Sequence, residues 1–326
     1  MGEEWQGRRV LVTGGAGFLG RHLVAAFRAA GAGVIAPRRG QYDLGRAEAC
    51  DAVLRDHVVD TVVHSAALYG GIWFNRVRPA EIFYQNLVMG VQLMEAARAA
   101  GVRRFVQIGT ACSYPGQLEG DLREVDLWAG PCHESVECYG LVKKVIEAQG
   151  RVYHAQHGLE VAHLILTNLY GPWDCYEPER SHVAAALVRK VVEAAEGGAP
   201  TLDAWGTGAP VREFLYVEDA AEAIVRAAAV CTDGRPLNIG TGIGTSIREL
   251  TTLLCELTGF GGRVTWDASK PDGAARKVLD VRRMRALLGW MPPTSLRDGL
   301  AQTVEWYRDH RARAAGRPAS RPEARA

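Results

Sequence analysis

Apolar and polar residues alternate along the first half of the chain in two different rhythms. Short runs rich in β-branched residues, such as "RRVLVTG", "GVIAP" and "TVVHSAA", are typical of strands. Between them, "RHLVAAFRAAG" and "EACDAVLRDH" place apolar residues at helical spacing, and residues 90–109 and 139–172 add two more helix-then-strand pairs. Repeated βαβ units of this kind predict an α/β fold with a doubly wound parallel sheet.

The second half follows a looser pattern. Residues 173–211 carry Trp, Cys, Pro and Gly around a single helix, and "NIGTGIGTSIRELTTLLCEL" opens another helix behind a Gly-rich turn. We expect residues 1–172 to form the first domain, with 213–243 returning to it, and 173–312 to form a smaller substrate-binding lobe. The tail 313–326 is rich in Arg, Ala and Pro without apolar periodicity, so we expect it to be disordered.

Composition narrows the classes of partner. The 326 residues are 48% apolar and 23% charged, which suits a globule with one or two cores, and the formal charge is only +1. No excess charge is present to attract a polyanion, so we expect neither nucleic acid nor membrane as a partner. No apolar run is long enough to span a bilayer and the start lacks signal-peptide order, which predicts a cytoplasmic protein. The seven cysteines form no CxxC pair, so we expect reduced thiols and no metal site.

A glycine-rich turn lies between the first predicted strand and the first predicted helix, in "VLVTGGAGFLGRHLVAAF". Glycine permits a tight turn and a close approach of backbone to a pyrophosphate, and the helix N-terminus offers free N–H groups. The strand-turn-helix context predicts a dinucleotide site in a Rossmann domain. The residues expected at the cofactor in this turn are Gly14, Gly17, Phe18, Leu19 and Gly20.

The end of the second predicted strand bears on the choice of cofactor. Sites that prefer NAD present Asp or Glu there to the adenosine ribose, whereas this chain has Arg38 and Arg39. Guanidinium groups suit a 2′-phosphate, so the sequence favours NADP. The alternative is that both arginines are solvated loop charges.

Three further residues indicate carbonyl chemistry. Tyr139 and Lys143 are spaced i, i+4 and share one face of a helix, so we expect the ammonium to lower the pKa of the phenol and Tyr139 to exchange a proton with a carbonyl oxygen. Thr110, at the end of the predicted strand "RFVQIG", can bind the same oxygen. A surface pair without function remains the alternative for Tyr139 and Lys143.

With "TGGAGFLG", the strand-end Thr110 and "YGLVK", the chain resembles the extended short-chain dehydrogenase/reductases. The runs "YGGIWFN", "TNLYGP", "GTGAPVREFLYVED" and "DASKPDG" are similar to the GDP-L-fucose synthase family, over about residues 9 to 308. The resemblance implies an NADPH-dependent epimerase/reductase that converts GDP-4-keto-6-deoxy-D-mannose to GDP-L-fucose. It also implies a homodimer built through the helices at 87–100 and 139–157.

Cys112 and His182 are candidates for carbon acid chemistry. A 4-keto sugar has acidic C–H bonds at C3 and C5, and inverting either centre needs a base on one face and an acid on the other. Cys112 lies two residues beyond Thr110, and His182 begins a helix in the substrate lobe. The matching residues in the resembled family form this acid/base pair. Taken singly, a buried apolar thiol and a structural histidine are the alternatives, and a thiol hydrolase or zinc site lacks further partners.

The resemblance supplies the remaining site residues. Ala66, Asn168 and His182 are expected to contact the cofactor together with Tyr139 and Lys143, and Lys190, Trp205, Arg212 and Asp272 the nucleotide sugar. The loop "GPCHESVECYG" departs from the family's usual segment, and Thr110 stands where the family commonly has serine. Competing functions are an epimerase-only or reductase-only enzyme on another nucleotide sugar and, from a different class, a dinucleotide sensor.

Overall fold

A six-stranded parallel sheet forms the centre of the larger lobe in the computed structural model, which describes residues 2–270 and 272–315. Its order is β2-β1-β3-β4-β5-β9, and every neighbouring pair is parallel. The strands are β1 (Arg9–Thr13), β2 (Gly33–Ile35), β3 (Thr61–His64), β4 (Arg104–Thr110), β5 (Glu160–Leu166) and β9 (Asp233–Ile239). The predicted α/β fold with a parallel sheet is therefore confirmed.

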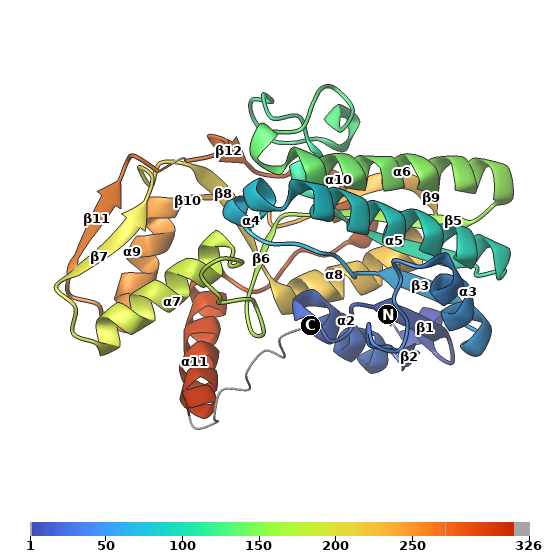
Figure 1. Cartoon of the computed structure of the whole chain (residues 1–326), viewed down its shortest axis with the longest axis horizontal. Helices are drawn as coiled ribbons and strands as arrows, with labels where there is room; N and C mark the ends of the chain where they lie inside the picture. The colour runs from blue at the N-terminus through green and yellow to red at the C-terminus, as the bar shows by residue number, and fades with distance from the viewer. Residues whose placement is uncertain (1, 271, 316–326) are drawn as a thin grey trace, which may run out of the picture.

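Helices cover both faces of this sheet (Figure 1). Helices α2 (Phe18–Ala29) and α8 (Val217–Val230) pack together on one face, and α3 (Ala47–Asp56), α5 (Pro79–Ala99) and α6 (Glu137–His157) on the other. Strand β1 shows why both faces of the sheet need a layer of helices. Val10 and Val12 join the core with α2 and α8, while Leu11 joins the core with α3, α5 and α6. The sheet is buried on both sides, which explains its nearly continuous apolar strands.

The smaller lobe is built around a second, mixed sheet and a two-stranded ribbon. The sheet consists of β6 (Asn168–Tyr170), β8 (Val211–Tyr216), β10 (Gly244–Ser246) and β12 (Arg276–Lys277), and the ribbon pairs β7 (Thr201–Trp205) with β11 (Arg263–Asp267). Helices α7 (Val183–Glu196), α9 (Ile247–Thr258) and α11 (Leu296–Ala315) bury a shared core beside them. A capping box between Ser246 and Glu249 begins α9 at the predicted Gly-rich turn.

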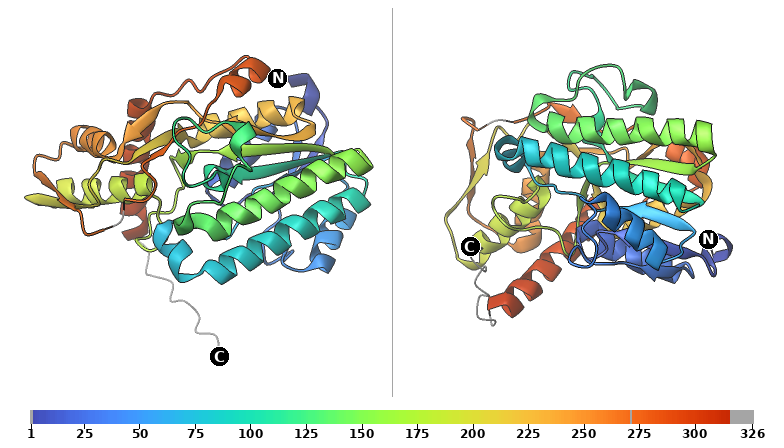
Figure 2. Two further views of the ribbon diagram at one scale, coloured as in Figure 1. Left: turned by 90° about the horizontal axis from the view of Figure 1, so that it is seen from above. Right: turned by 45° about the vertical axis from the view of Figure 1, so that its right-hand side comes forward.

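The chain crosses between the lobes more than once (Figure 2). Strand β8 belongs to the second sheet, whereas the next two elements, α8 and β9, return to the six-stranded sheet. The short helices are α1 (Gly2–Trp5), α4 (Ile72–Val77) and α10 (Arg282–Leu288), with single 3₁₀ turns at Ala111–Ser113, Glu124–Asp126 and Glu134–Val136.

Two sequence-based expectations concern the ends and the membrane. Helix α11 extends to Ala315, three residues into the predicted tail, and residues 316–326 lie outside the described part. Among the described residues, no helix combines the length and the apolar character that a membrane span requires.

Candidate active site

A cavity of about 1700 Å³ lies at the carboxyl ends of β1, β3 and β4 and extends into the smaller lobe. This is where ligands bind in doubly wound sheets, because the strand order changes direction there. The predicted residues that line it are Gly14, Gly17, Phe18, Leu19, Gly20, Arg38, Arg39, Ala66, Thr110, Cys112, Tyr139, Asn168, His182, Lys190, Trp205, Arg212 and Asp272. The structure thus brings together every predicted site residue except Lys143, which lies buried behind Tyr139.

The glycine-rich turn leaves no space for side chains. Gly14 has φ +67°, and a Cβ there would lie 2.8 Å from the Cα of Ala66. A Cβ on Gly20 would lie 2.0 Å from the carbonyl oxygen of Gly14. The first turn of α2 can therefore pack against the loop only if residue 20 is glycine. The Ala66 amide donates a 3.2 Å hydrogen bond to Thr13 Oγ1, which ties the ends of β1 and β3 together. Gly17, Phe18, Leu19 and Gly20, at the start of α2, line the cavity beside this turn.

Arg38 and Arg39 follow β2 and are both exposed at the cavity. The Arg38 amide donates to Gln41 Oε1 at 2.8 Å, and Arg39 pairs with Asp43 at 3.7 Å. Asp43 also lines the cavity, so a carboxylate that sequence reasoning missed lies beside the Arg39 guanidinium.

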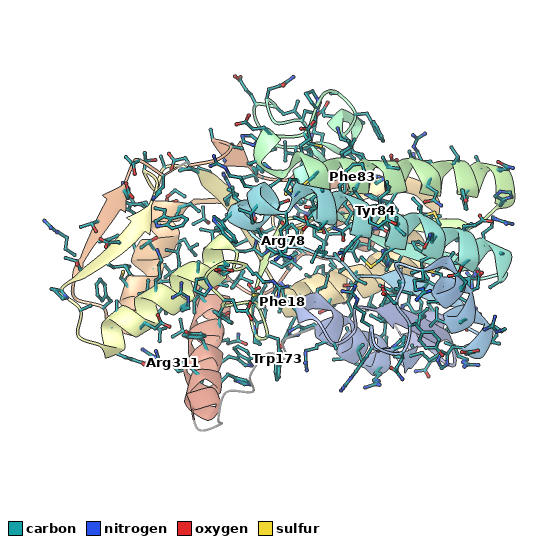
Figure 3. The ribbon with its side chains drawn as sticks, in the orientation of Figure 1. Phe18, Arg78, Phe83, Tyr84, Trp173 and Arg311 are labelled. Atoms are coloured by element: carbon teal, nitrogen blue, oxygen red, sulfur yellow. The ribbon has the colours of Figure 1, made fainter. Side chains whose placement is uncertain are left out.

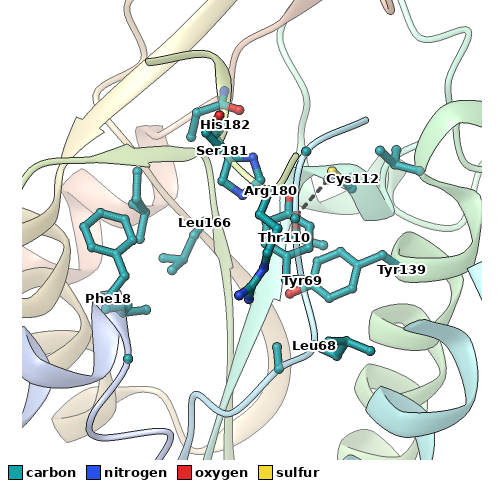
Figure 4. A pocket seen from close by; sticks show the side chains of 18 of the residues that line it. Phe18, Leu68, Tyr69, Thr110, Cys112, Tyr139, Leu166, Arg180, Ser181 and His182 are labelled. Carbon is teal, nitrogen blue, oxygen red and sulfur yellow. Dashed lines mark hydrogen bonds between the residues drawn. The ribbon is translucent and has the colours of Figure 1, made fainter. Parts of the chain in front are cut away.

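Thr110 and Tyr139 both line the cavity. Thr110 ends β4, and its Oγ1 accepts a 3.2 Å hydrogen bond from the amide of Cys112. Tyr139 lies in the first turn of α6, and Lys143 Nζ is 5.5 Å from the centroid of its ring. These side chains are positioned as the sequence predicted, with the hydroxyl-bearing strand end facing the helix that carries the Tyr–Lys pair (Figure 4).

The predicted effect of Lys143 on Tyr139 is wrong for this structure. Burial raises the pKa of Tyr139 well above its ordinary value, and the nearby Cys112 raises it further. The cause is that Lys143 is itself buried and loses charge: burial lowers its pKa to about 7. With a pKa near 7, the Lys143 amine is only partly protonated at neutral pH, so its charge does not compensate for the burial of the Tyr139 phenolate. Tyr139 therefore stays protonated at neutral pH and can act as a hydrogen-bond donor.

Cys112 and His182 reach the same part of the cavity from opposite lobes (Figure 4). Cys112 lies in the 3₁₀ turn after β4, and His182 is the N-cap residue of α7. Burial lowers the pKa of His182 to about 4, so the imidazole is neutral at pH 7. A thiol and a neutral imidazole from two lobes are a chemically suitable pair for proton transfer at carbon.

The ring of Tyr69, which sequence reasoning missed, lies between the rings of Tyr139 and His182. Its ring stacks on Tyr139 with centroids 4.3 Å apart and on His182 with centroids 4.6 Å apart. The interplanar angles are 27° and 28°, so Tyr69 is sandwiched between the other two rings. The run "YGGIWFN" contains Tyr69, but nothing in its pattern indicates which way the ring points.

The far end of the cavity carries the residues expected at the nucleotide sugar. Trp205 is 61% exposed, and its ring has Lys190 Nζ at 5.4 Å and Lys270 Nζ at 5.7 Å. Arg212 donates to the carbonyl oxygen of Asp272 at 3.4 Å, and burial lowers the pKa of its guanidinium. An open indole between cations and a partly desolvated arginine suit a planar base and a phosphate group.

Two of the predicted residues have structural partners. The Asp272 carboxylate accepts hydrogen bonds from the amide and the hydroxyl of Thr207, at 2.8 and 2.7 Å, and so fixes the loop after Trp205. Asn168 donates to the carbonyl oxygen of Glu213 at 2.9 Å, which ties β6 to β8 beside the cavity.

Comparison with known proteins places this geometry in a family. The NAD dependent epimerase/dehydratase family model matches residues 10–240. The GDP-L-fucose synthase of Sinorhizobium fredii is 36% identical over 301 residues, covering 92% of this chain and 96% of that protein. The GDP-L-fucose synthase of Escherichia coli is 33% identical over 319 residues, covering 95% and 99%.

The fold agrees with these relatives. The solved GDP-L-fucose synthetase of Naegleria fowleri bound to NADP superposes with a TM-score of 0.85 at 24% identity, covering 94% of this chain and 96% of that one. Identity at this level shows the fold alone, whereas the two bacterial synthases share about a third of their residues over nearly their whole length. The chain therefore belongs to the NAD dependent epimerase/dehydratase family, among the relatives of the GDP-L-fucose synthases.

Proposed function

We propose that the chain is an NADPH-dependent epimerase/reductase of a GDP-linked 4-keto-6-deoxyhexose, with GDP-4-keto-6-deoxy-D-mannose as substrate and GDP-L-fucose as product. The observation that carries the proposal is a single cavity lined by a glycine turn, by Thr110 and Tyr139, and by Cys112 and His182. The names of the curated relatives agree with this activity. A dinucleotide sensor would need none of the proton-transfer residues.

In the epimerising half, Cys112 and His182 exchange protons with the carbons beside the ketone. One group removes the C–H proton, and the electron pair moves onto the C4 oxygen to give an enolate. The hydroxyl groups of Thr110 and Tyr139 would stabilise this oxygen through hydrogen bonds. The other group then delivers a proton to the opposite face, so the carbon is inverted without any change in oxidation state. The neutral His182 is already able to accept a proton at pH 7.

In the reducing half, bound NADPH would supply the hydride that reduces C4. Tyr139 donates its proton to the C4 oxygen, which completes the alcohol. The pKa of Tyr139, raised by burial, keeps the phenol protonated until this step. Lys143, whose pKa burial lowers to about 7, can return a proton to Tyr139 near neutral pH.

The residues present fit the proposed cofactor. The glycine turn and the start of α2 would hold the pyrophosphate, because both line the cavity, a helix N-terminus offers N–H groups to an anion, and no Cβ fits at Gly14 or Gly20. Arg38 and Arg39 would hold the 2′-phosphate that distinguishes NADPH from NADH.

Solvent exchange tests the proposal directly. The protein is incubated with GDP-4-keto-6-deoxy-D-mannose and NADPH in deuterated water, and the product sugar is analysed by NMR. We expect GDP-L-fucose with deuterium at C3 and C5. A reduced sugar without deuterium would replace this function with a simple ketoreductase, and exchange without NADPH oxidation would replace it with an epimerase.

We also propose a homodimer formed through α5 and α6. The two helices pack side by side, and their outer faces expose apolar side chains (Figure 3). On α6, Leu141, Val145 and Val152 form one stripe, and Phe83 and Tyr84 project from α5. Two copies joined here would bury these side chains in a four-helix interface. The seven free cysteines suit a reducing compartment, and we propose a cytoplasmic location.

A further inference from the structure

Arg21 is a cation at the glycine-rich turn that sequence reasoning missed. It lies in the first turn of α2, is exposed, and lines the cavity together with Gly17 and Phe18. Its Nε donates a 2.9 Å hydrogen bond to the carbonyl oxygen of Ala16, which belongs to the turn itself. Within residues 2–270 and 272–315 it pairs with no carboxylate, and its two terminal nitrogens have no hydrogen-bond partner. The guanidinium is therefore fixed at the turn while most of its donors stay available to a ligand.

An indole ring holds the guanidinium of Arg21 from one side. The Cζ of Arg21 lies 4.4 Å from the centroid of the Trp173 ring. The same ring contacts α11 of the smaller lobe, since its centroid is 5.2 Å from that of Trp306 and 5.0 Å from that of His310 (Figure 3). Stacking on an indole fixes the plane of a guanidinium and leaves its edge free for hydrogen bonds. Helix α11 thus reaches the cofactor turn through Trp173 and Arg21.

The backbone at Trp173 has an unusual conformation. Its φ is +71°, and among the residues that the structure describes it is the one non-glycine residue with a positive φ. A bulky side chain is unfavourable in this region and adopts it where tertiary contacts impose it. His22, next to Arg21 on α2, has its Nε2 3.1 Å from the carbonyl oxygen of Pro172, so the strained turn is tied to the same helix. These contacts together place the indole against Arg21.

We propose that Arg21 is a further cofactor-binding residue that pairs with the diphosphate of the dinucleotide, and that Trp173 is a positioning residue that acts through Arg21. The diphosphate is the group that binds at a glycine turn and at the start of the following helix, whereas Arg38 and Arg39 follow β2. A guanidinium matches two phosphate oxygens in a planar, bidentate arrangement. The inference rests on the proposed function for the presence of a dinucleotide, and adds two residues that the glycine pattern does not indicate.

Fluorescence titrations of the full chain with NADPH and with NADH test the role of Arg21. Arg21→Gln removes the charge and keeps much of the side-chain length. We expect both dinucleotides to bind about tenfold more weakly, because both carry the diphosphate. Arg28→Gln is the matched control. It removes the same charge from the last turn of the same helix, at an exposed position outside the cavity, and should leave both affinities unchanged.

Salt provides a second measurement of the charge on Arg21. Because Arg21 is exposed, added salt should screen its attraction to the diphosphate. At about 1 M salt, where the Debye length is about 3 Å, the tenfold gap between the parent and Arg21→Gln should narrow to about threefold. A gap that does not change with salt would mean that the variant has lost packing rather than an ionic contact, and would overturn the proposal.

A double-mutant cycle tests the role of Trp173. Trp173→Gly removes the ring, and glycine adopts a φ of +71° without strain. We expect it to weaken NADPH binding by about threefold when Arg21 is present, and to have no further effect in the Arg21→Gln variant. Equal weakening in both backgrounds would overturn the positioning role, because Trp173 would then act without Arg21. Thermal melts verify folding, and Trp173→Leu, which keeps apolar bulk, enters the cycle if Trp173→Gly does not fold.

The outcomes separate this inference from the proposed function. Parental affinity for both dinucleotides in Arg21→Gln would overturn the diphosphate contact. A loss confined to NADPH would also overturn it, because the charge would then act on the 2′-phosphate. Either result leaves the proposed function in place, since the parent still binds NADPH. If the affinities change as expected but the parent forms no GDP-L-fucose, the proposed function fails and the role of Arg21 stands.

Discussion

Replacing His163 with leucine should make the fold less sensitive to acid. His64, Gln107 and His163 are direct neighbours across β3, β4 and β5, and all three are fully buried in the centre of the sheet. His64 Nδ1 is 3.0 Å from Thr13 Oγ1, but neither ring nitrogen of His163 has a hydrogen-bond partner. Burial, together with the charge of Lys143, lowers the pKa of both histidines to about 3.

The sign and size follow from proton linkage. The unfolded chain protonates each histidine below pH 6.5, whereas the folded protein does not until about pH 3. The stability that the neutral form contributes is complete above pH 6.5 and is lost as the pH falls from 6.5 to 3. In this range each histidine lowers the free energy of unfolding by about 1.4 kcal/mol for every pH unit below 6.5, which amounts to about 2 kcal/mol at pH 5. Two of them cost about 4 kcal/mol, a large part of an ordinary stability of 5–15 kcal/mol.

The assay compares thermal melts at pH 7.5 and pH 5.0. The leucine variant should melt near the parent at pH 7.5, because the change removes two unpartnered nitrogens, and the acid-induced drop in Tm should shrink by roughly 3 °C. His157→Gln, at an exposed position on α6, is the control and should leave the drop unchanged. If His163→Leu and the parent lose the same number of degrees, His163 does not titrate as its burial requires and the reasoning fails.

Three further predictions concern the site and the assembly. Cys112→Ser should slow deuterium incorporation beside the ketone by about 10²- to 10⁴-fold, as followed by NMR. Tyr139→Phe should slow NADPH oxidation, followed by absorbance at 340 nm, by a similar factor while keeping some exchange. If Cys112→Ser exchanges deuterium at the parent rate, the thiol has only a packing role. Arg38→Ala should weaken NADPH by roughly tenfold and leave NADH unchanged in fluorescence titrations, so equal parental affinities for the two would refute the 2′-phosphate argument. Tyr84→Asp on the exposed face of α5 should convert a dimer to a monomer in light scattering, whereas a monomeric parent would end the dimer proposal.

The sequence was sufficient for the parts of the fold that depend on local pattern. Strand β1 and helix α2 follow from an apolar run, a glycine turn and a helical period, and the steric limits at Gly14 and Gly20 explain why that turn has its composition. The second lobe was less predictable, because β6, β10 and β12 have only two or three residues each, too few to show an alternating pattern. All three are stabilised by pairing with β8, which the sequence pattern does not reveal.

The electrostatics of the site could not be derived from spacing alone. The i, i+4 relation correctly places Lys143 behind Tyr139, but the direction of the pKa shift depends on which effect is larger, the attraction of the ammonium or the burial of both groups. Burial depends on residues distant in sequence: Tyr69 from the β3–α4 loop covers one face of the Tyr139 ring, and His182 closes the stack from the other lobe. Because these rings stack on one another, the protonation states of the Tyr139 phenol and the His182 imidazole are set jointly by the docking of the two lobes. A ligand that separates the lobes would therefore hydrate both groups at once, shifting the pKa of Tyr139 down and that of His182 up, towards their ordinary values.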